Sequence, residues 1–143
     1  VNAAVLIEAL RRFPDHRILW TLPNNDPGRD AILQKAGQLL IDTNPEEFIR
    51  YCRRAACVIG NSSMGIIEAP ALEVPSVNIG TRQEGRLRGP SVFDCVEDVD
   101  AIEAAINAAL VYTGPYDNPY GEAGASTRIA DILANMSSIN QVK

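Results

Sequence analysis

The segment Cys57-Val-Ile-Gly-Asn-Ser-Ser-Met-Gly-Ile-Ile-Glu-Ala-Pro70 contains the pattern that decides the fold of this chain. Its first three residues are apolar and predict a short buried strand, which is followed by a turn of small and polar residues and then by a helix. A strand that ends in a turn beside a helix start leaves several main-chain N–H groups without partners, next to the positive end of the helix dipole. Such a position favours the binding of anions, and of phosphate groups in particular.

Two hydroxyl groups and one carboxylate in this segment extend the prediction. Ser62 and Ser63 lie in the turn and supply two further donors to a phosphate group. Glu68 lies about one and a half turns into the predicted helix, where its carboxylate is placed to accept hydrogen bonds from the hydroxyls of a ribose. The residues alone leave an alternative open, because Asn and Ser are common helix caps and a surface position also suits Glu68. The segment therefore predicts either a nucleotide site or an ordinary capped helix.

Strands and helices alternate along the rest of the chain. Apolar runs rich in β-forming residues predict strands at 17–22, 38–42, 57–59, 75–79 and 92–96. Capping residues and apolar periodicity predict helices that begin near residues 1, 27, 45, 64, 98 and 125. Alternation of this kind, with nearly continuous apolar strands, predicts a parallel sheet covered by helices on both faces. The predicted fold class is α/β, a Rossmann-like three-layer sandwich, formed by a single domain over residues 1–143.

Polar loops are predicted at one edge of this sheet. Ligands bind beyond the carboxyl ends of the strands in open parallel sheets. Four predicted loops lie at that edge and carry polar side chains: Asn24, Asn25 and Asp26; Thr43 and Asn44; Ser62 and Ser63; Arg82 and Arg86. The last of these loops, 80–90, is long for a compact domain, which favours a functional role. The convergence of four polar loops supports a nucleotide site more strongly than any one loop does.

Composition and charge exclude several classes of function. A formal net charge of −5, with no stretch dense in Lys or Arg, disfavours a nucleic-acid-binding protein. No apolar run is long enough for a membrane span, and no signal peptide is recognised. The three cysteines are an odd number, which fits reduced thiols in a cytoplasmic protein better than a disulfide framework. His16 is the single histidine and has no partner at ligand spacing, so we expect no metal. No GxGxxG motif follows a predicted strand, which disfavours a dinucleotide enzyme, and we expect no cofactor.

Four segments, in the same order, closely resemble the UDP-N-acetylglucosamine 2-epimerase family. They are Pro23-Asn-Asn-Asp-Pro-Gly28, Gly60-Asn-Ser-Ser-Met-Gly-Ile-Ile-Glu-Ala-Pro70, Pro75-Ser-Val-Asn-Ile-Gly-Thr-Arg-Gln-Glu-Gly-Arg86, and Asn118-Pro-Tyr-Gly121 followed by Ala125-Ser126 and Arg128-Ile129. The resemblance extends over residues 20–133 and is nearest to the hydrolysing, sialic-acid-pathway branch.

The resemblance implies a place for this chain in a larger fold and a set of ligand contacts. It implies the C-terminal domain of a GT-B fold, in which the nucleotide sugar lies between two Rossmann-like domains. By the resemblance, Ser62 and Ser63 contact the diphosphate and Glu68 holds the ribose hydroxyls. The main chain at Thr43 and Asn44 lies near the uracil, beside Asp42 where the family often has a His. The residues that the resemblance assigns to UDP are Asn24, Thr43, Asn44, Ser62, Ser63, Glu68 and Arg82.

The resemblance also implies a reaction. Deprotonation at C2 of the sugar is followed by anti-elimination of UDP, and hydrolysing members then add water to release N-acetylmannosamine. The acid and base carboxylates belong mainly to the N-terminal domain, so we expect no catalytic residue on this chain and no turnover by it alone.

The sequence also suggests a longer parent protein, and three other functions compete with the epimerase. A helix that starts at residue 1 with no strand before it indicates one domain of a longer protein, which is expected to include the missing N-terminal domain and to form a homo-oligomer. The competing hypotheses are an epimerase for a related diacetamido-sugar nucleotide, a GT-B glycosyltransferase, and a free-standing nucleotide-binding module.

Overall fold

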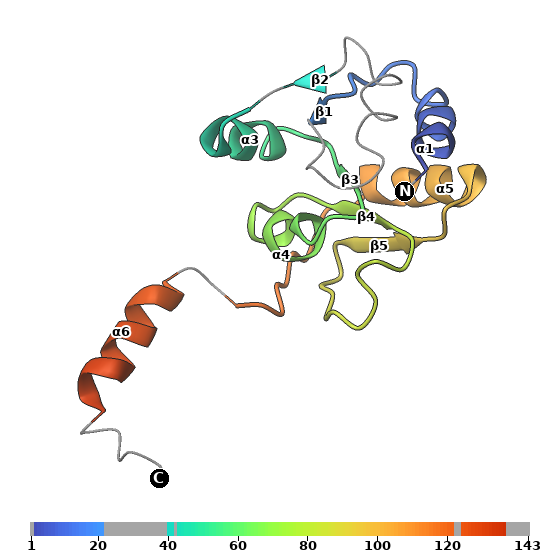
Figure 1. The fold of residues 1–143 in the computed structure, drawn as a ribbon. Coiled ribbons are helices and arrows are strands. Elements are labelled where there is room, and N and C mark those ends of the chain that lie inside the picture. Colours follow the sequence, from blue (N-terminus) through green and yellow to red (C-terminus); the bar gives the residue numbers. More distant parts are fainter. Residues whose placement is uncertain (1, 22–39, 42, 122–123, 137–143) are drawn as a thin grey trace.

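The computed structural model describes residues 2–21, 40–41, 43–121 and 124–136 (Figure 1). The helices and strands of these residues are, in chain order, α1 (Ala3–Leu10), β1 (Trp20–Thr21), β2 (Leu40–Ile41), α3 (Pro45–Cys52), β3 (Val58–Gly60), α4 (Met64–Ala71), β4 (Ser76–Ile79), β5 (Val92–Cys95), α5 (Val99–Leu110) and α6 (Ala125–Asn135). The predicted helix that begins near residue 27 lies outside the described residues, as does Asn24 of the predicted site.

All described strand pairs are parallel, as the alternation of strands and helices predicts. β4 lies between β3 and β5, and its Val77 is in register with Ile59 on one side and Phe93 on the other. β1 pairs with β2 in a second parallel sheet, with Trp20 opposite Leu40. Among the described residues, the hydrogen-bonded strands therefore form two sheets of two and three strands.

Helices cover both faces of β4, and alternate side chains of this strand face different helices. Val77 and Ile79 belong to a core cluster with residues of α1 and α5, including Ile102 and Ile106. On the opposite face, the Ser76 hydroxyl donates to the Gly65 carbonyl of α4. All four residues of β4 are buried, so the strand is covered on both faces as expected for the middle layer of three.

Local capping chemistry fixes several helix ends where the sequence predicts them. Asn44 and Glu47 form a reciprocal capping box at the start of α3. Asp98 accepts from two main-chain N–H groups at the start of α5, the helix predicted to begin near residue 98. α4 ends before Glu73, whose left-handed φ of 58° turns the chain out of the helix ahead of β4. The helix predicted to begin near residue 1 is observed as α1, which ends at Leu10 and is followed by turns.

α6 has the predicted bounds but no buried residue. It lies apart from the rest of the described structure in Figure 1. The apolar side chains that the sequence places on one of its faces are between 50% and 61% exposed: Ile129, Ile132, Leu133 and Met136. The helix therefore presents an uncovered apolar face.

The Arg88 side chain stabilises the loop after β4 through hydrogen bonds and an ion pair. Its guanidinium donates to the main-chain carbonyls of Arg86 at 2.6 Å and Gln83 at 3.1 Å, and its Nε lies 2.6 Å from Oδ2 of Asp94 on β5. Asp94 in turn accepts a 2.6 Å hydrogen bond from Nδ2 of Asn78 on β4. The loop is therefore attached to both strands that it connects.

The same loop contacts the turn between β3 and α4. The buried Gln83 donates from Nε2 to the carbonyl oxygen of Asn61 at 2.9 Å. A later segment contacts α4 and the loop, since Asn118 donates to the carbonyl oxygen of Ile67 at 2.9 Å. At Gly89 this segment comes so close that a Cβ atom would lie 2.0 Å from a main-chain oxygen of residue 117. Long-range contacts thus fix the loop at several points.

Replacing Arg88 tests whether this side chain stabilises the loop. Arg88→Ala removes two charge-assisted hydrogen bonds and one ion pair, and we expect a loss of about 2 kcal/mol in the free energy of unfolding, measured in urea. Arg86→Ala is the matched control, because the exposed Arg86 side chain makes no such contacts with the described residues, and it should change the free energy by less than about 0.5 kcal/mol. Equal effects of the two substitutions would contradict the role of Arg88.

Candidate functional site

Consecutive main-chain donors are exposed at the turn between β3 and α4. Among the described residues, no acceptor lies within hydrogen-bonding distance of the N–H groups of Asn61, Ser62 and Ser63. The next donor, the N–H of Met64, has only a long contact of 3.4 Å to Oγ of Ser62. Ser63 is the N-cap residue of α4 and makes no side-chain cap hydrogen bond. The strong cap that the alternative interpretation requires is therefore missing, and three adjacent donors stay available to an anion.

Three predicted side chains accompany these donors. Ser62 is exposed and Ser63 is half-buried, so both hydroxyls lie in the turn itself. Glu68 is exposed on α4, one helical turn beyond Met64, while its neighbours Ile66 and Ala69 face the core. The carboxylate is therefore directed away from the core and open to a ligand or to solvent.

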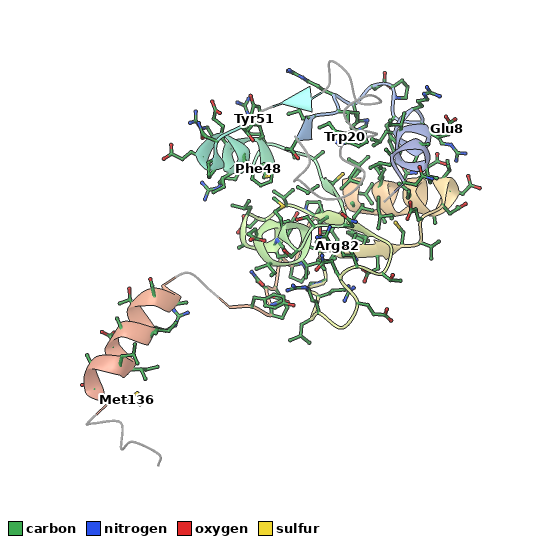
Figure 2. The ribbon with its side chains drawn as sticks, viewed as in Figure 1. Glu8, Trp20, Phe48, Tyr51, Arg82 and Met136 are labelled. Atoms are coloured by element: carbon green, nitrogen blue, oxygen red, sulfur yellow. The ribbon has the colours of Figure 1, made fainter. Side chains whose placement is uncertain are left out.

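The arginines of the loop after β4 have different environments. Arg88 is occupied by loop carbonyls and Asp94, so it holds the loop and does not extend from it. Arg82 is exposed and directly precedes Gln83, the residue that contacts the turn (Figure 2). Arg82 therefore lies on the loop that contacts the turn, next to the residue that makes the contact.

Thr43 and Asn44 lie directly before α3, and Asn44 is the N-cap residue of that helix. The Asn44 side chain accepts from the N–H of Glu47 at 3.0 Å, and its own N–H donates back to the Glu47 carboxylate at 3.3 Å. The Asn44 carbonyl accepts from Phe48 within α3. These groups of Asn44 are therefore used at the start of α3, and among the described residues no hydrogen bond joins Thr43 or Asn44 to the β3–α4 turn.

Sequence reasoning missed the polar residues that support the turn. Gln83 binds the turn, and Asn78 with Asp94 holds the neighbouring strands at its base. A polar Asn within the otherwise apolar run Val77 to Ile79 was a signal for Asn78. Asn118 was noted only as part of a resembling segment, although its side chain holds α4.

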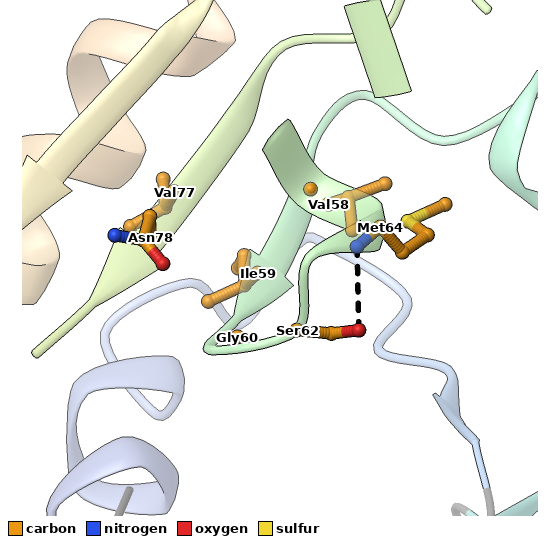
Figure 3. A pocket seen from close by; sticks show the side chains of 8 residues that line it. Val58, Ile59, Gly60, Ser62, Met64, Val77 and Asn78 are labelled. Atoms are coloured by element: carbon orange, nitrogen blue, oxygen red, sulfur yellow. Dashed lines mark hydrogen bonds between the residues drawn. The ribbon is translucent and has the colours of Figure 1, made fainter. Parts of the chain in front are cut away.

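A cavity of about 30 Å³ lies behind the turn at the carboxyl ends of β3 and β4 (Figure 3). Its walls include Gly60, Ser62, Met64 and Asn78. This space is far too small for a nucleotide.

Other chemistry is limited in the described part of the chain. No cluster of three or more His, Cys, Asp or Glu side chains there is arranged to hold a metal ion. The three cysteines are free, and burial raises the pKa of the Cys57 thiol to about 11, which keeps it protonated and unreactive at neutral pH. Within the described ranges, no helix combines the length and apolar character that a membrane crossing requires.

Comparison with known proteins identifies relatives of this chain. Residues 1–134 match the family described as UDP-N-acetylglucosamine 2-epimerase. A polysialic acid biosynthesis protein, P7, of Escherichia coli is 36% identical over 142 residues, which cover 90% of this chain and 36% of that protein. A UDP-N-acetylglucosamine 2-epimerase of Neisseria meningitidis is 31% identical, over 86% of this chain and 36% of the enzyme.

A third relative and a solved structure extend the comparison. A hydrolysing UDP-N,N'-diacetylbacillosamine 2-epimerase of Legionella pneumophila is 31% identical over 88% of this chain and 36% of that enzyme. The crystal structure of Methanocaldococcus jannaschii UDP-GlcNAc 2-epimerase in complex with UDP-GlcNAc and UDP matches with a TM-score of 0.66 and 16% identity, over 92% of this chain and 39% of that one.

These comparisons confirm two predictions. The structural match, at its low identity, concerns the fold, and it confirms the predicted α/β fold class of a GT-B domain. The chain spans 36% of the length of each of the three relatives. The match of the family over residues 1–134 shows that this chain belongs to the UDP-N-acetylglucosamine 2-epimerase family.

Proposed function

We propose that this chain is the UDP-binding, C-terminal domain of a hydrolysing UDP-N-acetylglucosamine 2-epimerase, which converts UDP-N-acetylglucosamine to N-acetylmannosamine and UDP. The observation that carries the proposal is the row of three main-chain N–H groups, at Asn61, Ser62 and Ser63, to which the described residues offer no acceptor. Membership of the family supports the substrate class. The printed names of relatives in polysialic acid biosynthesis and hydrolysing epimerisation support the branch.

The turn is suited to a diphosphate in both charge and geometry. Adjacent N–H groups and the N-terminus of α4 present partial positive charge, and the hydroxyls of Ser62 and Ser63 add donors. Arg82 contributes a full positive charge from the neighbouring loop. In an elimination that releases UDP, negative charge develops on the departing diphosphate, and donors placed there stabilise the transition state.

Glu68 completes the proposed nucleotide contacts. Its carboxylate accepts hydrogen bonds only, so a pair of ribose hydroxyls is a suitable partner. Asn24, Thr43 and Asn44 stay in the proposal as further UDP contacts. The capping role of Asn44 leaves the main chain at Thr43 as the better candidate of that pair for contact with the base.

Catalytic groups are proposed to lie elsewhere in the intact protein. No residue of this chain is assigned to proton transfer at C2 of the sugar, and this is consistent with a chain that spans 36% of the length of its relatives. The exposed apolar face of α6 supports contact with a further domain or a second copy, as proposed for the N-terminal domain and the homo-oligomer. A cytoplasmic location stays a prediction from the sequence.

A second substrate class has specific support. Two relatives are named as hydrolysing epimerases of N,N'-diacetylbacillosamine nucleotides, so a diacetamido-sugar nucleotide is the second candidate. A GT-B glycosyltransferase would need an acceptor for UDP release, which the assay of the intact parent tests. Tight UDP binding by this chain alone, with no longer gene product, would favour a free-standing binding module.

Glu68→Ala tests the proposed nucleotide contact. The loss of charge-assisted hydrogen bonds to the ribose should weaken UDP binding by about 1.5–3 kcal/mol, or about 10- to 150-fold in dissociation constant, measured by calorimetry. Glu8→Ala is the matched control, because Glu8 is an exposed carboxylate on α1 and its removal changes the net charge equally. An unchanged affinity of the Glu68 variant would return this residue to an ordinary surface position.

Assay of the intact parent tests the reaction itself. With UDP-N-acetylglucosamine and no acceptor, we expect release of UDP and N-acetylmannosamine in equal amounts, detected by chromatography, and no turnover by the 143-residue chain alone. Product from a diacetamido-sugar nucleotide only would establish the second substrate class. UDP release that needs an added acceptor would establish a glycosyltransferase, and an active 143-residue chain would contradict the assignment of catalysis to another domain.

A further inference from the structure

Asn78 has a buried amide oxygen to which the described residues offer no hydrogen-bond donor. The residue is 2% exposed, and its Nδ2 donates to Oδ1 of Asp94 at 2.6 Å. A carboxylate accepts and does not donate, so this contact fixes which end of the amide faces β5. The oxygen Oδ1 is left on the other side, where no donor of the described residues reaches it. A buried acceptor in this state is unfavourable unless a donor from outside the described residues satisfies it.

The cavity behind the β3–α4 turn lies on that other side. Figure 3 shows the Asn78 oxygen turned toward β3 and its nitrogen turned away from β3. The cavity volume of about 30 Å³ is enough for one water molecule and too small for a sugar or a phosphate group. The lining includes Asn78 together with Gly60 at the end of β3 and Ser62 of the turn, so the cavity extends from β4 to the turn.

A chain of polar contacts leads from the turn to this cavity. It begins at the Asn61 carbonyl, which accepts from the Gln83 side chain, and the Gln83 carbonyl accepts from Arg88. Arg88 then pairs with Asp94, and Asp94 accepts from Asn78. One donor between Asn78 Oδ1 and the turn would close these contacts into a ring.

We propose that a single water molecule occupies this cavity, donates a hydrogen bond to Oδ1 of Asn78 and bonds to the β3–α4 turn. The unsatisfied oxygen requires a donor, which excludes an anion, and the volume excludes a larger ligand. The water connects β4 to the turn and holds the N–H groups of Asn61, Ser62 and Ser63 outward. This consequence for UDP rests on the proposed function, whereas the water site itself does not.

A crystal structure of the ligand-free chain tests the site directly. We expect an ordered water within about 3.2 Å of Asn78 Oδ1. An empty cavity, or an amide oxygen satisfied by a protein donor, would overturn the proposal. This observation decides the water site even if the chain does not bind UDP.

Asn78→Leu tests the link between the water and the turn. Leucine has the same number of side-chain heavy atoms but neither the acceptor nor the donor of the amide, so the water should be absent and UDP affinity should fall by at least about fivefold. Ser91→Ala is the matched control, because it removes another buried polar group that has no partner among the described residues. Ser91 lies beside Ser76, at the end of β4 away from the turn, so this variant should bind UDP as the unaltered chain does. UDP binding by the folded Asn78→Leu variant at the unaltered affinity would overturn the positioning role. If that variant does not fold, the ligand-free structure still decides the proposal.

Discussion

The parallel pairing of β3 with β4 is the interaction on which the candidate site depends. Its register sets Gly60 opposite Asn78, and the next pairing sets Asn78 opposite Asp94. Because the three strands end at the same level, the turn after β3 and the loop after β4 start side by side. A slip of one residue would turn Asn78 to the other face of the sheet and separate it from Asp94. The buried β4, covered by α4 on one face and by α5 on the other, prevents such a slip.

The polar groups around the turn have two roles: some side chains support the turn, whereas the main-chain N–H groups of the turn are exposed to a ligand. The side chains of Gln83, Arg88, Asp94 and Asn78 bind main-chain carbonyls or one another. The turn itself presents donors outward. A chain with a net charge of −5 can therefore offer an anion site, since local N–H dipoles dominate at contact distance while distant surface charges are screened by salt.

The elements that sequence analysis predicted correctly are those fixed by local chemistry. Asn44 with Glu47, and Asp98, cap helices through contacts within three residues, and the bounds of α6 follow from its own periodicity. The β3–α4 turn follows from one continuous segment. The contacts that support this turn were not predictable, because they join residues far apart in the sequence. Asn78 binds Asp94, 16 residues later, and Gln83 binds Asn61, 22 residues earlier. The sequence likewise gives no sign that Arg88 turns inward while Arg82 stays exposed, since that depends on the path of the loop.

The central claim is that the main-chain donors of the β3–α4 turn bind the diphosphate of the nucleotide. A titration of the ¹⁵N-labelled chain with UDP, and separately with uridine, followed by NMR, tests it most directly because each amide is observed individually. We expect the amide signals of Asn61, Ser62 and Ser63 to shift with UDP and to be nearly unaffected by uridine, which lacks the phosphates. Absence of shifts at these three amides on saturation with UDP, or equal shifts with uridine, would contradict the claim.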